Sequence, residues 1–213
     1  MISPDLARTV FGILGNAITL CLFLSPVPTF VRIYKNKSVE QFSQIPYIAT
    51  FLNCMLWVLY GLPFVKPNSL LVLTINSAGV AIELCYIVVF ITYSEGARRR
   101  MTVLLFLADV ALVAIVAAVV LSLYHTHGKR TLVIGIISVF FCIMMYASPL
   151  VAMRTVIKTK SVEFMPFYLS MVSFFNGVCW TIYALLQFDI NVLCFHWASL
   201  CQNGCENALS QCY

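Results

Sequence analysis

The segment Lys35-Asn-Lys-Ser-Val-Glu40 recurs with a single change as Lys158-Thr-Lys-Ser-Val-Glu163, 123 residues later in the chain. The same offset brings five further identical pairs into register. These pairs are Gly12 with Gly135, Pro26 with Pro149, Asn53 with Asn176, Trp57 with Trp180, and Tyr60 with Tyr183. The chain therefore contains an internal duplication, and the duplicated segments set the expected fold.

The composition places both copies in a membrane. Of the 213 residues, 62% are hydrophobic and only 10% are charged, and the mean hydropathy is +0.95. Six apolar stretches approach the roughly 20 residues that a helix needs to cross a bilayer. They are 10–31, 45–65, 70–93, 101–124, 132–153 and 165–188. Because backbone groups in lipid must bond within the protein, we predict an all-α integral membrane protein.

The duplication and the spans together predict two parallel three-helix repeats joined by a linker helix. The first repeat covers about 8–94, the linker 101–124, and the second 131–213, incomplete after about residue 190. An odd connecting helix is required, since without it the two repeats would have opposite orientations.

The basic residues divide unequally between alternate loops. Nine lie in one set: Arg32, Lys35, Lys37, Arg98, Arg99, Arg100, Arg154, Lys158 and Lys160. Four lie in the other: Arg8, Lys66, Lys129 and Arg130. Because cytoplasmic loops carry the excess of Lys and Arg, we expect the N-terminus on the extracellular side.

No catalytic or metal-binding pattern is found. Five cysteines fall within apolar spans, where a thiol packs as a small hydrophobe. The remaining four, with His196 nearby, lack a recognised zinc spacing. There is no nucleophile–His–acid set and no phosphate-binding loop, so we expect neither an enzyme nor a cofactor, and no nucleic-acid partner.

Several stretches are similar to the plant SWEET (MtN3/saliva) sugar transporters. They are Gly12-Ile-Leu-Gly-Asn16, Leu24-Ser-Pro-Val-Pro-Thr-Phe30, Leu52-Asn-Cys-Met-Leu-Trp57 with Tyr60-Gly61, Tyr146-Ala-Ser-Pro149, and Lys158 to Pro166. SWEET carriers are a standard example of parallel internal repeats. The resemblance implies bidirectional, facilitative sugar transport by alternating access, in the plasma membrane. The neighbourhoods of Ser38 to Glu40, Trp57 to Gly61 and His125 to His127 resemble the clade associated with glucose and other hexoses.

The predicted sugar-binding residues are Asn53 and Trp57, their repeat partners Asn176 and Trp180, and Asn76, which resembles the family's sugar-contacting Asn. Amides bond sugar hydroxyls, and an indole packs against the sugar's C–H face. The alternative is that these side chains only hold helices together, as polar residues in membranes often do. Their duplication favours a site.

Gates are implied by the same resemblance. Pro26, Pro46, Pro149 and Pro166 match the family's inner gate and would act as hinges, because proline removes a helix hydrogen bond. Tyr60, Tyr183 and Asp189 resemble its outer gate, although Asp189 could equally be an interfacial charge. Two acids in spans, Glu83 and Asp109, have no repeat partner, so we expect transport without ion coupling.

The chain departs from the family pattern after Ile190. It is apolar for only about ten residues and polar from Gln202 onward, so we expect a seventh helix that is truncated or malformed and lies at the membrane surface. Such a chain would transport little. The alternative function is therefore a non-transporting isoform that forms hetero-oligomers with intact relatives. Homo-oligomers and bound lipid are also expected. A seven-helix receptor or retinal protein is disfavoured by the duplication.

Overall fold

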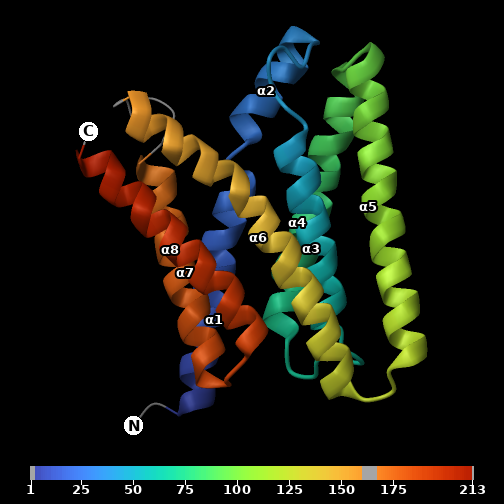
Figure 1. The fold of residues 1–213 in the computed structure, drawn as a ribbon, viewed down its shortest axis with the longest axis vertical. Coiled ribbons are helices and arrows are strands. Elements are labelled where there is room, and N and C mark those ends of the chain that lie inside the picture. Colours follow the sequence, from blue (N-terminus) through green and yellow to red (C-terminus); the bar gives the residue numbers. More distant parts are fainter. Residues whose placement is uncertain (1–2, 160–166, 213) are drawn as a thin grey trace. The chain divides into compact units, whose positions relative to one another are not determined.

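The computed structural model describes residues 3–159 and 167–212, and these residues form helices and no strands (Figure 1). The helices are α1 (Pro4–Leu24), α2 (Val27–Asn36), α3 (Ile45–Gly61), α4 (Leu70–Tyr93), α5 (Gly96–Leu123), α6 (His127–Thr159), α7 (Phe167–Leu186) and α8 (Ile190–Cys212). The predicted all-α fold is confirmed.

Five helical segments of the described chain are long and apolar enough to cross a membrane. They are Pro4–Asn36, Leu70–Tyr93, Gly96–Leu123, His127–Met145 and Tyr168–Leu186. The shorter Ile45–Gly61 is also apolar. These segments correspond to the six predicted spans, so the chain is an integral membrane protein.

The predicted hinge prolines occupy different kinds of position. Pro26 lies between α1 and α2, where it interrupts the first span and caps the start of α2. Pro46 lies in the first turn of α3, where a missing N–H costs nothing, so it starts this helix and does not bend it. Pro149 lies within α6, but its side chain is outside the described set. Pro166 lies outside the described residues.

The helices gather into two compact units, which do not coincide with the sequence repeats. Unit 1 joins Met1–Leu22 to Val139–Tyr213, and unit 2 is Phe23–Ser138. The sequence predicts repeat boundaries in loops, whereas the unit boundaries fall within α1 and α6. The reason is that the N-terminal part of α1 packs with α7, and the start of α6 bonds to the α3–α4 loop through Thr131, which donates to the Val65 carbonyl (2.8 Å).

The first copy of the repeated hexapeptide has a structural role in unit 2. Val39 is buried with Phe30 and Ile33 of α2 and with Tyr86 and Phe90 of α4. The Phe30 and Tyr86 rings stack at 4.2 Å. This cluster fixes α2 against α4, which explains why an apolar residue stands in an otherwise polar motif.

Glu40 closes the same loop by bonding to residues on both sides of it. Arg32 forms a salt bridge with its carboxylate (2.6 Å), and Asn36 donates to the same group. These hydrogen bonds, first from Asn36 and then from Arg32, lower the pKa of Glu40. Arg98, at the start of α5, donates to the Glu40 carbonyl (2.7 Å). The motif thus connects the α2–α3 loop to α5.

The final helix differs from the sequence-based expectation. The backbone is helical without a break from Ile190 to Cys212, and α8 runs beside α7 in unit 1 (Figure 1). A truncated helix was expected because polar residues follow Gln202. Gly177 shows why the helix forms: a Cβ there would lie 2.9 Å from Leu200, so α7 and α8 approach closely enough for packing to override composition.

A glycine in α4 allows a close contact in unit 2. A Cβ on Gly79 would lie 2.7 Å from Cys54 Sγ and 2.8 Å from the Phe23 ring. We predict that Gly79→Val destabilises the protein by about 1–3 kcal/mol through overpacking, seen as a lower thermal unfolding midpoint in detergent. Gly128→Val is the matched control, since nothing lies within 4 Å of Gly128. Equal midpoints for the two variants would contradict the prediction.

Candidate functional site

In unit 1, two predicted sugar-binding residues are joined by a third residue. Thr19 of α1 donates its hydroxyl hydrogen to Asn176 Oδ1 (2.9 Å) and accepts from Trp180 Nε1 (3.2 Å). Both partners lie on α7. One hydroxyl therefore satisfies two polar groups, which leaves the NH₂ group of Asn176 as the donor that a ligand could use.

The Trp180 indole is held from two further sides. A Cβ on Gly15 would lie 2.8 Å from Trp180 Nε1, so only glycine allows α1 to approach the indole this closely. His196 of α8 stacks on the indole, with ring centroids 5.4 Å apart and an interplanar angle of 8°. Only 3% of Trp180 is exposed. The ring is thus a fixed apolar surface next to polar groups.

The same aromatic pair occurs in both units. Trp180 and Tyr183 meet edge to face at 5.2 Å and 75°, and Trp57 and Tyr60 meet at 5.0 Å and 68°. Both tyrosines are buried. The aromatic pairs on α3 and α7 therefore share one geometry.

Each of these tyrosine hydroxyls accepts a hydrogen bond from a cation. Arg8 Nη2 donates to Tyr183 at 2.7 Å, and Lys66 Nζ donates to Tyr60 at 3.1 Å. The guanidinium carbon of Arg8 also lies 4.2 Å from the centroid of the Tyr183 ring. The two predicted outer-gate tyrosines are thus both bonded to positive charges.

The amide groups differ between the two units. Asn53 is buried, and its Oδ1 has no hydrogen-bond partner among the described residues. Asn76 is half-buried and donates to the carbonyl of Val72 in its own helix (2.8 Å). Because a buried amide oxygen without a partner is costly, Asn53 is prepared to accept a hydrogen bond from a ligand or water.

Asp189 has a local role at the start of α8. Its Oδ1 accepts from the backbone N–H of Val192 (3.3 Å), and its carbonyl accepts from that of Leu193 (2.9 Å). A carboxylate at this position caps the helix and complements its dipole. This capping role accounts for an aspartate at position 189 whether or not the residue is part of a gate. The gate role remains a prediction.

The comparisons identify the family. The profile described as sugar efflux transporter for intercellular exchange (MtN3/saliva) matches residues 9–98 and 132–210. The chain belongs to the SWEET family. The bidirectional sugar transporter SWEET4 of rice (Oryza sativa subsp. japonica) is 58% identical over 192 residues, which is 90% of this chain and 74% of that protein. SWEET4 of Arabidopsis thaliana is 48% identical over 213 residues, 100% of this chain and 85% of that protein.

A solved structure agrees with this assignment. A eukaryotic SWEET transporter at 37% identity superposes with a TM-score of 0.93, covering 99% of this chain and 98% of that one. The SWEET fold therefore includes α8, in spite of its composition. The family is one of transporters, not enzymes.

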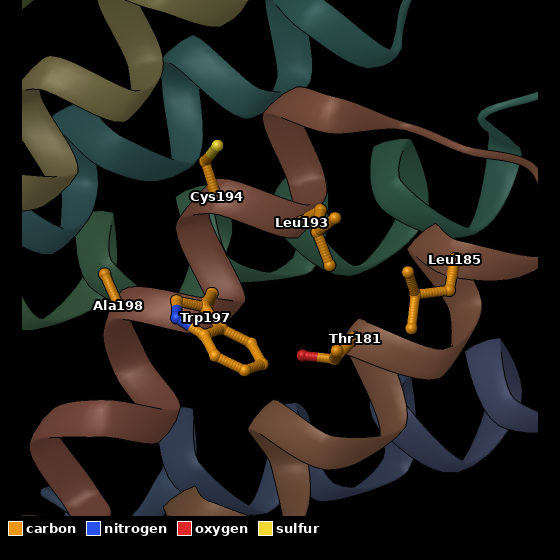
Figure 2. A pocket seen from close by; sticks show the side chains of 6 residues that line it. All are labelled: Thr181, Leu185, Leu193, Cys194, Trp197 and Ala198. Atoms are coloured by element: carbon orange, nitrogen blue, oxygen red, sulfur yellow. The ribbon is translucent and has the colours of Figure 1, made fainter.

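The groove between α7 and α8 is a separate feature of this SWEET chain. It measures about 410 Å³, and its six lining residues, shown in Figure 2, are Thr181, Leu185, Leu193, Cys194, Trp197 and Ala198. None of them was predicted to bind sugar. Thr181 supplies the one hydroxyl, so the groove lacks the several polar groups that would orient a sugar.

Sequence reasoning missed Gly15, Thr19, His196 and Arg8. A weak signal existed, because Gly12, Gly15 and Thr19 form a series of small residues in an apolar span, which is typical of close helix packing. Nothing in the sequence indicated which helix they would contact.

We predict that Thr19→Val impairs sugar transport more than Thr19→Ser. The valine leaves the Trp180 N–H and the Asn176 carbonyl unpaired, at a cost of about 1–3 kcal/mol, whereas serine keeps the hydroxyl. The measurement is labelled-sugar uptake per molecule at the membrane. Equal uptake by the two variants would show that the bridge is dispensable.

Proposed function

We propose that this chain is a bidirectional, facilitative sugar carrier. The observation that carries the proposal is the duplicated Asn–Trp–Tyr face, present in both units with matching ring geometry, together with the unpaired Asn53 carbonyl. These groups suit a neutral ligand with many hydroxyls. Membership of a sugar transporter family supports the same conclusion.

We assign each proposed sugar-binding residue a contact that suits its chemistry. The Asn53 oxygen accepts from a sugar hydroxyl, and the NH₂ group of Asn176 donates to one. Trp57 offers an indole face to the C–H side of the ring, and Trp180 offers the face that His196 does not cover. Asn76 contributes a further amide. No charged side chain is needed, which agrees with a neutral substrate.

We propose a hexose, such as glucose, as the sugar. The support is the resemblance to the hexose clade around Ser38 to Glu40, Trp57 to Gly61 and His125 to His127. In the first of these neighbourhoods, Arg32 and Asn36 bond to Glu40. Competition by unlabelled glucose, compared with sucrose, separates the two substrate classes.

Alternating access is the mechanism we propose. Pro26 interrupts the first span close to Leu22 and Phe23, where α1 passes from one compact unit to the other, so this break is suited to act as a hinge. Pro149 and Pro166 are proposed as further hinges of the inner gate, and Pro46 is proposed as an inner-gate residue at the start of α3, where it does not bend the helix. Tyr60, Tyr183 and Asp189 are proposed as the outer gate.

Transport by the chain itself is favoured over a non-transporting isoform. The argument for an inactive chain was a missing last helix, and α8 is a continuous helix packed on α7. We further propose residence in the plasma membrane, with bound lipid and oligomers with itself or with relatives.

The first test is labelled-hexose uptake in a transport-deficient cell. We expect uptake by the chain as written, and stimulation of labelled efflux by unlabelled hexose outside, as for an uncoupled bidirectional carrier. Trp57→Ala, Asn76→Ala and Trp180→Ala should each reduce uptake by about 5- to 150-fold, because a well-formed sugar contact is worth about 1–3 kcal/mol.

Trp197→Ala is the matched control for this test. It removes an equally large side chain that is 61% exposed and lines the α7–α8 groove, none of whose lining residues is a proposed sugar-binding residue. Uptake should therefore stay near the original. If the chain carries no hexose while a version with a relative's seventh helix does, the non-transporting isoform is correct.

The second test concerns orientation. Asn36-Lys37-Ser38 is a glycosylation sequon, but the unequal distribution of Lys and Arg predicts that it faces the cytoplasm. We expect no glycan at Asn36, and an N-terminal epitope tag stained in unpermeabilised cells. Glycan on Asn36, or a tag reached only after permeabilisation, would reverse the orientation and the assignment of the gates.

A further inference from the structure

We propose that Arg8 is a positioning residue for sugar transport, which holds the N-terminal half of α1 against α7 and thereby places the Trp180 indole. This inference rests on the proposed function. Its geometrical basis is the double contact with Tyr183: a hydrogen bond of 2.7 Å from Nη2 to the hydroxyl, and the guanidinium 4.2 Å above the ring.

The contact has a clear energetic reason. Only 2% of Tyr183 is exposed, and a phenol buried this deeply in a membrane protein needs a partner for its hydroxyl. Arginine is suited to the task because its planar guanidinium can lie over an aromatic ring and still donate to an oxygen. At Tyr60, Lys66 makes the bond while its Nζ lies farther from the ring, at 5.4 Å.

Arg8, Gly15 and Thr19 of α1 each approach α7, and these contacts define the α1–α7 seam. As α1 advances from Arg8 through Gly15 to Thr19, its partners on α7 move back from Tyr183 through Trp180 to Asn176, so the helices run antiparallel. The middle contact is made by Gly15, which has no side chain to hold the Trp180 indole in place. The distance between α1 and Trp180 therefore depends on the two polar anchors, Arg8 and Thr19, on either side.

The bond between Arg8 and Tyr183 has no equivalent at the corresponding repeat positions. The residue at the repeat position of Arg8 is Thr131, whose hydroxyl donates to the Val65 carbonyl. Tyr60 instead bonds to Lys66, six residues ahead in the same unit. Tyr183 alone draws its cation from a helix of the other repeat, 175 residues away. The contact between Arg8 and the tyrosine of the other repeat therefore occurs for Tyr183 and not for Tyr60.

The test compares Arg8→Gln and Arg8→Lys with Tyr183→Phe. Arg8→Gln should raise the KM for hexose about tenfold, with the amount at the membrane unchanged, because the indole is displaced. Arg8→Lys should restore part of the affinity, since it retains the bond but loses the planar group. The double variant with Tyr183→Phe should be no worse than Arg8→Gln alone. Lys129→Gln, which removes an equal charge from an exposed site, should have no effect.

A second readout keeps the inference separate from the proposed function. In the Trp57→Phe, Trp197→Phe background, Trp180 is the one remaining tryptophan, and its fluorescence reports its exposure in purified protein. Arg8→Gln should increase acrylamide quenching without lowering the thermal unfolding midpoint by more than a few degrees. Unchanged quenching overturns the inference, whatever the transport result. If Arg8→Gln increases quenching but the original chain takes up no hexose, the proposed function is overturned and the positioning role of Arg8 is not.

Discussion

In a bilayer, a polar group must find its hydrogen-bond partner within the protein, and this constraint governs both the fold and the site. For the backbone it leaves helices. For the side chains it favours polar groups that each interact with more than one partner, and the α1–α7 seam contains two examples. A single Thr19 hydroxyl serves an amide and an indole, and a single Arg8 guanidinium serves a phenol oxygen and its ring. Asn53 is one of several exceptions among the described residues, because its buried oxygen lacks such a partner there.

The duplication preserves ring packing better than polar pairing. Trp57 and Tyr60 match Trp180 and Tyr183 within a few tenths of an ångström, since large rings tolerate few arrangements. The polar partners have diverged: Thr19 corresponds to Cys142, Arg8 to Thr131, and Lys66 to Asp189. The two repeated faces therefore differ in their polar chemistry although their rings pack alike. The side-chain oxygen of Asn176 accepts a hydrogen bond from Thr19, whereas that of Asn53 has no partner among the described residues.

The sequence predicted the aromatic and amide residues because both copies carry them at the same helical spacing, and two copies of a pattern are hard to attribute to chance. It missed Thr19, Arg8 and His196 for a physical reason. Thr19 and Arg8 meet partners that are 157 to 175 residues away along the chain, and a helix periodicity says which residues share a face but not which helix faces them. The expectation of a truncated final helix failed similarly, because composition alone omits the close packing that Gly177 allows between α7 and α8. The expectation that this segment is a weak membrane span agrees with the structure, since α8 is not among the described helices that are long and apolar enough to cross a membrane.

The sequence by itself determined the membrane environment, the internal repeat, the helical class and the family, since each depends on composition or on the order of residues. The tertiary structure decided the rest. It divides the chain into compact units that cut across the repeats, makes Asp189 a helix cap and leads Pro46 to start a helix, and selects which polar groups are paired. These features depend on distances between segments far apart in the chain, and such distances exist only after the helices have packed.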